Sequence, residues 1–463
     1  MFLNDTITAV ATPPGEGGIG IVRISGPSAF TIADRIFICR PGKPSILSGN
    51  TVHYGVIRDP ITEERVDDAL LLLFRKPRSY TGEDTVEFSC HGGPITLRRV
   101  LLLTLSEGAR MAEPGEFTQR AFLNGKMDLA SAEAVCDQIH ARTEAAHKIA
   151  RMQREGGLSR EVEKLRHELI GALAAVEVTL DFSEDVGDLD YDALHVQIAA
   201  LQEQIRRLLA TASRGRIYRE GARLAIVGRP NVGKSSLMNA ILRENRAIVT
   251  PIAGTTRDVI EESASVKGIP ITAIDTAGLR DTEDLVERIG VERAGAALDT
   301  ATLALFVLDA EEGWTMEDDV IADRLEGLTA VWTLNKCDQI SMVQRIALLR
   351  EIQARDDVTI VIPISALSGE GMYELEEAIA STLLQGSGDA VQGVLVASAR
   401  HQNALEEAQV SLAEAIRTVE ARLPEDFISI DLRGALDSLG KITGETATEE
   451  IIHRIFHDFC VGK

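Results

Sequence analysis

Residues 228–235, Gly-Arg-Pro-Asn-Val-Gly-Lys-Ser, are the first group in this chain whose types and spacing could do chemistry. They follow an apolar stretch, Leu224–Val227, and precede a helix-like segment, Leu237–Leu242. This context gives the pattern meaning, because glycines let successive backbone N–H groups face phosphates at a helix N-terminus. Lys234 can then reach the β- and γ-phosphate oxygens, and the Ser235 hydroxyl can ligate Mg²⁺. The run predicts a nucleoside triphosphate site, with an accidental glycine turn as the alternative.

A second motif, Asp-Thr-Ala-Gly at residues 275–278, follows the apolar run Ile271–Ile274. Its carboxylate can hold the Mg²⁺ shell, and the Gly278 amide can sense the γ-phosphate. Because the motif stands at the carboxyl end of an expected strand, it fits the edge at which doubly wound sheets bind ligands.

Two more motifs select the base. Residues 335–338, Asn-Lys-Cys-Asp, follow the expected strand Ala330–Leu334, and residues 365–367, Ser-Ala-Leu, follow Thr359–Ile364. Asp338 can accept hydrogen bonds from both N1–H and the 2-amino group of guanine, a pair of donors that adenine lacks. Backbone groups of residues 365–367 can contact the guanine O6. The ordered set of four motifs predicts a GTP site and excludes the alternative that residues 228–235 are an accidental glycine turn.

Composition limits the class of protein. A chain of 463 residues is too long for one core, so two to four domains are expected. The content of 45% hydrophobic and 26% charged residues is typical of soluble proteins, and no apolar run is long enough to span a bilayer. The first residues lack the pattern of a secretory signal. The five cysteines are scattered without a C-x-x-C pair, which favours the reducing cytoplasm.

The formal net charge is −23, from 71 acidic and 48 basic residues. A chain this acidic does not attract nucleic acid over its whole surface. If RNA is the substrate, contact must be local, or a partner must supply much of the positive charge. The aromatic content of 4% also disfavours a stacking platform for single strands.

Periodicity divides the chain into four segments. Residues 1–122 mix β-rich runs with glycine and proline turns, which predicts an α/β domain. Residues 123–216 and 385–463 repeat apolar side chains at three- and four-residue steps, which is typical of helices. Residues 217–384 hold the GTP motifs. We therefore expect a multidomain α/β plus all-α protein in which a Ras-like P-loop GTPase domain is inserted into a discontinuous helical domain.

At this point the chain resembles the MnmE (TrmE) family of GTPases, which modify the wobble uridine of certain tRNAs. The resemblance extends over essentially the whole chain. A C-terminal cysteine tetrapeptide alone could be a prenylation signal, but here it accompanies the GTPase motifs. The matching strings are Gly-Thr-Thr-Arg-Asp at 254–258, Phe-Cys-Val-Gly-Lys at 459–463, Ala-Thr-Pro-Pro-Gly at 11–15, Thr-Gly-Glu-Asp at 81–84, His-Gly-Gly-Pro at 91–94 and Pro-Gly-Glu-Phe at 114–117.

The resemblance implies a reaction and partners. A one-carbon unit from a folate, 5,10-methylene-tetrahydrofolate, is joined with an amine to C5 of uridine 34, giving an aminomethyl or carboxymethylaminomethyl group. 5-formyl-tetrahydrofolate is the corresponding bound analogue. An FAD-dependent partner, MnmG (GidA), shares the chemistry in a heterotetramer-type complex. The chain itself is expected to form a cytoplasmic homodimer through residues 1–122, without a membrane contact.

The resemblance also implies the residues of the GTP site. Mg²⁺ is expected at Ser235 and Thr256, and K⁺ at Asn231 with carbonyls of Thr250, Ile252 and Thr255. A fixed K⁺ there does the electrostatic work of an arginine finger. The full set of expected GTP contacts is Asn231, Val232, Gly233, Lys234, Ser235, Ser236, Thr250, Pro251, Ile252, Ala253, Gly254, Thr255, Thr256, Asp275, Thr276, Ala277, Gly278, Asn335, Lys336, Asp338, Ser365, Ala366 and Leu367.

Hydrolysis needs a group that positions the attacking water. Ras-like GTPases use a glutamine just after the second motif, but Leu279 occupies that position here and can neither donate nor accept. The resemblance implies Glu287 as the catalytic residue, acting through a bridging water. Without the resemblance, Glu287 would be interpreted as an exposed helix carboxylate.

The resemblance places the folate at Arg23, Glu87, Lys126 and Lys463. A carboxylate such as Glu87 suits a pterin edge, because it can accept two parallel N–H bonds. Cys460 is a candidate catalytic thiol beside the one-carbon donor, and its alternative is a small buried hydrophobe.

Two other functions stay open at this stage. The chain could be an Era-like GTPase switch in ribosome assembly without covalent RNA chemistry, or a scaffold whose N-terminal domain only dimerises. Folate binding separates the first from the modification enzyme, and GTP turnover separates the second.

Overall fold

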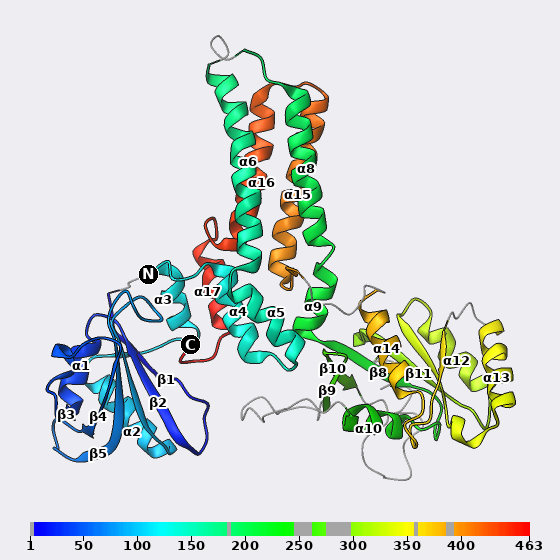
Figure 1. Ribbon diagram of the computed structural model, residues 1–463, viewed down its shortest axis with the longest axis horizontal. Helices are drawn as coiled ribbons and strands as arrows, with labels where there is room; N and C mark the ends of the chain where they lie inside the picture. The colour runs from blue at the N-terminus through cyan, green and yellow to red at the C-terminus, as the bar shows by residue number, and fades with distance from the viewer. Residues whose placement is uncertain (1–3, 183–186, 245–261, 275–297, 356–359, 386–392) are drawn as a thin grey trace.

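The computed structural model describes residues 4–182, 187–244, 262–274, 298–355, 360–385 and 393–463. Figure 1 shows three bodies: a blue sheet domain at one end, an upright helical bundle in the middle, and a second sheet domain, green to orange, at the other end. The bundle combines green helices from before the second sheet with orange and red helices from after it. The expected fold class, a GTPase-type domain interrupting a helical domain, is confirmed; the residue boundaries of the four segments stay predictions.

The N-terminal body is built on a seven-stranded sheet. Its elements are β1 (Ile7–Val10), β2 (Gly17–Ser25), α1 (Ala29–Ile36), β3 (Phe37–Cys39), η1 (Pro44–Ile46), β4 (Thr51–Arg58), β5 (Arg65–Phe74), β6 (Thr85–Gly92), α2 (Pro94–Ser106), β7 (Arg110–Met111) and α3 (Glu116–Leu123). The strand order is β3-β4-β5-β6-β2-β1-β7, and only the β1–β7 pair is parallel. Helices α1 and α2 cover one face of the sheet.

Period-two alternation decides which residues of this sheet form the core. Along β5, Leu71 and Leu73 are buried against α1 and α2, whereas Leu70 points to the opposite face and is exposed. Tyr54 on β4 lies opposite Leu70 and is exposed as well. The outer face of this sheet is therefore apolar and uncovered over β4 and β5.

The helical body contains α4 (Leu129–His140), α5 (Glu144–Arg154), α6 (Gly157–Asp181), α8 (Tyr191–Leu209) and α9 (Ala212–Glu220), and then α15 (Ala399–Glu420), α16 (Glu425–Thr443) and α17 (Glu449–His457). One core joins the two groups, because Leu165 and Leu169 of α6 are buried together with Leu405 and Leu412 of α15. The three- and four-residue spacing that predicts these helices is the spacing that buries them.

The second sheet domain supplies the GTP motifs. Its elements are β8 (Ala222–Val227), α10 (Lys234–Glu244), β9 (Glu262–Val266), β10 (Ile269–Ile274), β11 (Leu303–Asp309), α12 (Met316–Leu325), β12 (Ala330–Asn335), η2 (Cys337–Gln339), α13 (Met342–Arg355), β13 (Val361–Pro363) and α14 (Met372–Leu383). The strand order is β13-β12-β11-β8-β10-β9, and every pair except β9–β10 is parallel. The carboxyl ends of the parallel strands consequently share one edge.

The helical body touches both sheet domains. Ile149 of α5 and Tyr218 of α9 belong to the same buried cluster as Ile271 of β10. At the other end, Phe456 and Phe459 pack with Leu129 of α4, and the chain ends beside the N-terminal domain (Figure 1). Among the residues that the structure describes, no helix has the length and apolar character needed to cross a membrane.

Candidate functional site

The phosphate loop connects β8 to α10 and has the backbone shape that an anion requires. Asn231 and Gly233 have φ angles of +64° and +95°. A Cβ added to Gly233 would collide with the side-chain amide of Asn335, so only glycine fits. Such left-handed residues turn successive N–H groups toward one side of the loop. The loop is thus shaped for phosphate.

Lys234 begins α10, and its ammonium lies against the loop. Its Nζ donates to the carbonyl oxygens of Gly228, at 2.8 Å, and Arg229, at 2.6 Å. The next residues, Ser235 and Ser236, are exposed at the helix N-terminus, where the backbone carries partial positive charge. A cation and two hydroxyls therefore stand where triphosphate oxygens and their metal would lie.

Arg229 anchors this loop, a role that the sequence pattern does not reveal. Its guanidinium is buried and pairs through Nε with Asp318 at 2.9 Å and through Nη1 with Glu312 at 2.6 Å. It also donates to the carbonyl of Gly313 at 3.1 Å. The loop is consequently held by residues that lie more than 80 positions later in the chain. The sequence marked only one of these partners, because Asp318 forms a capping box with Thr315 at the start of α12.

Asn335 ties the base-binding segments to the phosphate loop. Its Nδ2 donates to the Val232 carbonyl at 2.8 Å, and its Oδ1 accepts from the Ala366 amide at 3.0 Å. Three of the four predicted motifs therefore meet at one side chain.

Lys336 and Asp338 complete the base side of this edge. Lys336 has φ +64°, and its Nζ lies 2.6 Å from the carboxylate of Asp309, which is buried at the end of β11. Asp338 follows in η2 with its carboxylate exposed, and Leu367 is exposed beyond the buried Ser365. The arrangement leaves Asp338 available to a base, while Lys336 is held by an acid that sequence reasoning missed.

Some predicted residues lie outside the described part of the chain. They are Glu287, the switch residues Thr250, Pro251, Ile252, Ala253, Gly254, Thr255 and Thr256, and the second motif Asp275, Thr276, Ala277 and Gly278. Their positions stay predictions, as does the K⁺ cage, which combines Asn231 with the carbonyls of Thr250, Ile252 and Thr255.

Two of the residues predicted for folate binding, Arg23 and Glu87, lie on the outer face of the N-terminal sheet. Arg23 of β2 and Glu87 of β6 are register partners, and Arg23 Nε lies 2.6 Å from Glu87 Oε1. The guanidinium also lies over the rings of Phe117, at 5.4 Å, and Tyr80, at 5.7 Å from their centroids. The structure thus brings a cation, a carboxylate and the ring of Tyr80 together in one half-buried place, above the fully buried ring of Phe117.

The C-terminal tail reaches this place. Arg23 Nη1 donates to the Gly462 carbonyl at 3.2 Å, and the Phe117 amide donates to the Lys463 carbonyl at 3.1 Å. Gly462 has φ +94°, and a Cβ there would collide with the carbonyl of Val10. Burial lowers the pKa of Lys463, and the charge of Arg23 lowers it further. Residues from the two ends of the chain therefore share one site.

Cys460 and Lys126 lie at the margin of this site. The Cys460 carbonyl accepts from the Gly115 amide at 3.4 Å, while the residue as a whole is exposed, so the expected alternative of a buried hydrophobe is wrong. Lys126 is exposed and donates to the Pro77 carbonyl at 3.0 Å. In the described ranges, no group of three or more His, Cys, Asp or Glu residues could hold a metal ion.

A buried charge cluster joins the helices that carry the tail. Glu133 of α4 is paired with Arg400 of α15 at 2.7 Å and with His401 at 2.7 Å. Burial works against its ionisation, but the facing side chains of His401 and Arg400 hold the pKa of Glu133 well below its usual range. This contact connects helical segments from before and after the GTPase-type domain.

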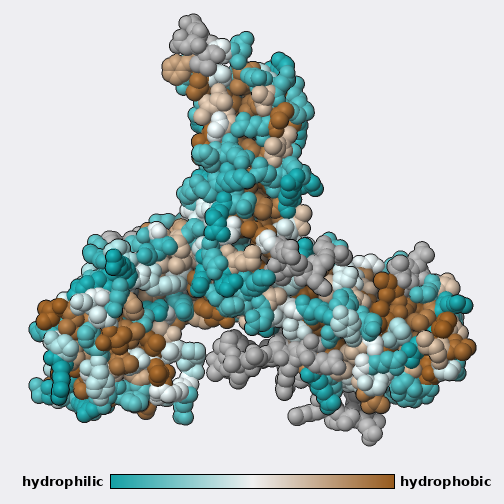
Figure 2. Space-filling view, viewed as in Figure 1, coloured by the Kyte–Doolittle hydropathy of each residue, from teal (hydrophilic) through white to brown (hydrophobic). Residues whose placement is uncertain are grey.

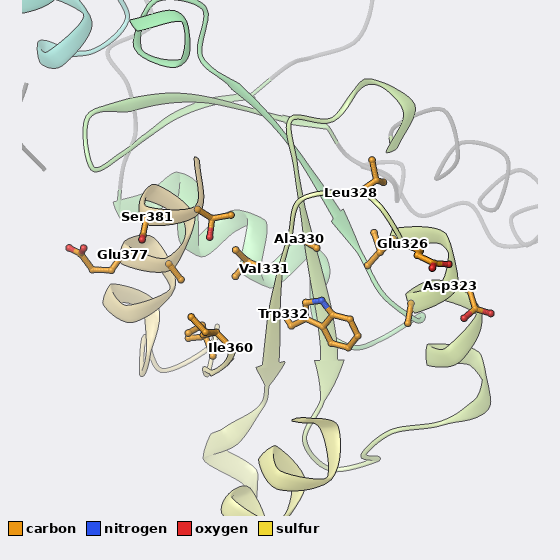
Figure 3. A pocket seen from close by; sticks show the side chains of 14 residues that line it. Asp323, Glu326, Leu328, Ala330, Val331, Trp332, Ile360, Glu377 and Ser381 are labelled. Atoms are coloured by element: carbon orange, nitrogen blue, oxygen red, sulfur yellow. The ribbon is translucent and has the colours of Figure 1, made fainter. Parts of the chain in front are cut away.

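Figure 3 shows a groove of about 980 Å³ that belongs to neither site. It lies at the amino ends of β12 and β13, with Trp332 on its floor and Glu377 of α14 on its wall. The phosphate loop and Asn335 meet the opposite, carboxyl ends of these strands. None of the residues predicted for function lines the groove.

Known protein families match this chain over most of its length. A family model described as MnmE helical domain matches residues 129–460, and one described as GTP-binding protein TrmE N-terminus matches residues 6–126. The tRNA modification GTPase MnmE of Alkaliphilus oremlandii (strain OhILAs) is 47% identical over 465 residues, with 100% of each chain covered. The protein of the same name from Clostridioides difficile (strain 630) is 46% identical over 466 residues, again with 100% of each covered.

Among solved structures, Aquifex aeolicus Era bound to GDP and aluminium fluoride is 30% identical, covers 41% of this chain and 66% of that chain, and has a TM-score of 0.30. Relatives named tRNA modification GTPase MnmE, by contrast, align from end to end. The chain therefore belongs to the MnmE family of tRNA modification GTPases.

Proposed function

We propose that this GTP-hydrolysing enzyme of tRNA modification installs an aminomethyl or carboxymethylaminomethyl group on C5 of the wobble uridine, using a folate one-carbon unit. The observation that carries the proposal is the docking of Gly462 and Lys463 beside Arg23 and Glu87. The family's C-terminal string thereby becomes part of a second site, on a domain other than the one that carries the phosphate loop. A nucleotide switch alone would need no such site.

At the nucleotide site, the chain's own groups bind and orient GTP. The loop N–H groups and Lys234 hold the phosphates, and Asp338 accepts from the guanine edge. Ser235 and Thr256 would hold Mg²⁺, and Asn231 with carbonyls of Thr250, Ile252 and Thr255 would hold K⁺. The exposed hydroxyl of Ser235 at the start of α10 fits an oxygen-preferring cation. Glu287 is proposed to position the attacking water.

At the second site, the residues present fit a reduced folate. The half-buried Tyr80 offers apolar ring surface, and the Glu87 carboxylate can accept parallel N–H bonds from a pterin edge. Arg23, Lys126 and Lys463 can pair with anionic parts of the ligand. A bound folate supplies the one-carbon unit, and the exposed Cys460 thiol stands at the rim as a candidate catalytic group.

The outer sheet face suggests a homodimer. Val52, Leu72, Glu87 and Arg23 follow one another across β4, β5, β6 and β2 in register, so the exposed apolar face runs directly into the folate site. In Figure 2, hydrophobic residues gather on the surface of this domain. A second copy of the chain is its proposed occupant. The FAD-dependent MnmG (GidA) protein is proposed as the further partner, in the cytoplasm.

The Era-like alternative is not favoured, because the relatives that match along the full length are named tRNA modification enzymes. Mass spectrometry of tRNA nucleosides from cells lacking this chain tests the proposal. We expect the C5-modified wobble uridines to disappear and to return when the chain is restored. Unchanged wobble uridines in the deleted cells would refute the proposed function.

A further inference from the structure

Helix α5 concentrates positive charge in a protein whose formal net charge is −23. Its sequence, EAAHKIARMQR, has three Lys or Arg residues and one acidic residue. Lys148, Arg151 and Arg154 are exposed, whereas Ile149 and Gln153 are buried against the rest of the protein. The cations therefore share the solvent side of one helix, advancing about 4.5 Å along its axis at each three-residue step.

This helix packs along α4, and Leu129 of α4 is buried with Phe456 and Phe459 of the segment that carries the C-terminal tail. Burial raises the pKa of Tyr80, and the positive charges of Arg23 and Arg154 oppose that shift. Arg154 also adds to the lowering of the Lys463 pKa that burial and Arg23 begin. The positive charge of Arg154 therefore bears on both residues.

The N-terminal domain supplies further cations near Tyr80. Lys76 and Arg78 are exposed in the segment that leads to Tyr80, and Lys126 is held at the same segment by its bond to the Pro77 carbonyl. Together with the α5 side chains they form a set that we call the basic cradle: Lys76, Arg78, Lys126, Lys148, Arg151 and Arg154.

We propose that the basic cradle is the tRNA-binding surface of this chain, with phosphates on both sides of the anticodon loop contacting the two halves of the cradle while the target uridine reaches the site between them. The proposal rests on the proposed function, since it names how that site takes its RNA substrate. The basic cradle would provide the local positive surface that a protein of net charge −23 needs to contact RNA.

The usual alternative for such residues is a solvated helix face stabilised by surface ion pairs. Arg151 Nε is 3.8 Å from the Glu155 carboxylate, and both side chains are more than half exposed. A pair of this kind contributes little to stability. A contact between these cations and RNA phosphates contributes more free energy, because each neutralised phosphate releases condensed counterions. The same release makes binding dependent on salt.

The double variant Arg151→Ala/Arg154→Ala tests the cradle, and α8 offers a matched control. Arg206 and Arg207 also lie exposed in the last turn of their helix and pair with a nearby carboxylate, that of Glu203. Arg206→Ala/Arg207→Ala thus removes the same charge from the last turn of another helix in the bundle. The probe is an unmodified transcript of a tRNA with uridine at the wobble position, titrated against purified full-length chain over a salt series.

We expect the α5 variant to weaken binding by about tenfold at low salt and to reduce the slope of log affinity against log salt by about 1.5. The α8 control should match the wild type. Arg151→Lys/Arg154→Lys should restore most of the affinity, because charge rather than packing carries the contact. GTP turnover should be unchanged in all variants, which also shows that they fold.

An α5 variant with wild-type affinity and slope would overturn the cradle. So would a purified wild-type chain that does not bind the transcript at low salt, because the positive surface would then belong to a partner. Neither result touches the proposed function, which fails only if wobble uridines are unchanged in cells lacking the chain.

Discussion

Gly462 shows how one residue decides whether the tail can dock. Its φ of +94° is disfavoured for residues with a side chain, and a Cβ would meet the carbonyl of Val10. Its own carbonyl accepts from Arg23, so a displaced Gly462 would also free the guanidinium that pairs with Glu87. The geometry of the proposed folate site thus depends on the one glycine of the tail, Gly462.

We therefore predict that Gly462→Ala lowers the affinity for 5-formyl-tetrahydrofolate by at least about tenfold, since strained positions of this kind cost roughly 1–3 kcal/mol. Titration of the purified protein measures it. Gly108→Ala is the control, because Gly108 has φ +104° with open space around its Cβ. GTP turnover should stay the same in both variants. Equal folate affinity of the two would mean that the tail is not part of the site.

Asn231 carries the second prediction at this scale. If its side-chain oxygen ligates K⁺, GTP hydrolysis in wild type should be much faster in K⁺ than in Na⁺, and Asn231→Ala should abolish the difference. Asn231→Gly should behave alike, and it accommodates the φ of +64° without strain. GDP affinity should change little, because Lys234 and Asp338 remain. Persistent K⁺ stimulation in both variants would exclude Asn231 as a ligand.

Residue spacing alone could predict the phosphate loop and the Asn335–Asp338 motif, because nucleotide chemistry restricts both to short strings. Arg229 and Asp309 could not be predicted in the same way. Their partners are Glu312, Asp318 and Lys336, which only the fold brings near. Arg23 and Glu87 were predicted as folate contacts only through family resemblance, since alone each would be interpreted as a solvated charge, and that role stays a prediction.

At the scale of elements, the contact between α4 and α15 holds the two sequence parts of the helical body together. Glu133 lies between Arg400 and His401, and its carboxyl group is almost fully buried. Removal of one member of a buried charge set leaves the others unpaired, which is strongly destabilising. The charge cluster of Glu133, Arg400 and His401 is thus needed to hold together the two parts of the helical body that the GTPase-type domain separates in sequence.

We predict that Glu133→Gln destabilises the protein by about 3 kcal/mol at neutral pH. The folded-state pKa of Glu133 is depressed below its ordinary value of 4.5. Its contribution is therefore fully present above about pH 4.5 and is lost as the pH falls below it. Denaturant unfolding from pH 7 to pH 3 should show the wild type approaching the variant in acid. A constant difference across that range would show that ionised Glu133 is not the stabilising species.

The helices could be predicted from apolar residues at three- and four-residue steps, because this spacing places those side chains on the buried face, as with Leu165 and Leu169 in α6. The N-terminal strands were only partly apparent. Strand β2 begins with the exposed Gly17 and Gly18, which have no side chains and so add nothing to the apolar alternation that indicates a strand. Pairing between distant strands leaves no local signature.

For the whole molecule, the uncovered face of the N-terminal sheet predicts a constitutive dimer. Tyr54 is 67% exposed on that face, and Ile430 of α16 is 65% exposed on the bundle. Tyr54→Asp should convert the dimer to a monomer in light scattering after gel filtration, because it would bury a charge in the interface. Ile430→Asp should leave the mass unchanged. Dimers of unchanged stability in the Tyr54 variant would place the interface elsewhere.

The molecule separates nucleotide hydrolysis from the proposed one-carbon chemistry. The phosphate loop lies in one sheet domain and the tail site on the other, with the helical body between them (Figure 1). The contacts of the Cys460–Lys463 tail are with the N-terminal domain and not with the phosphate loop. Deletion of the tail therefore allows the two activities to be measured separately.

The most direct test of this separation pairs two measurements on the truncated chain: GTP turnover of the purified protein and nucleoside mass spectrometry of tRNA from cells that carry only this form. The account predicts GTP turnover close to that of wild type together with loss of the modified wobble uridines. A parallel fall of both activities would contradict it, because the tail would then belong to the GTPase machinery.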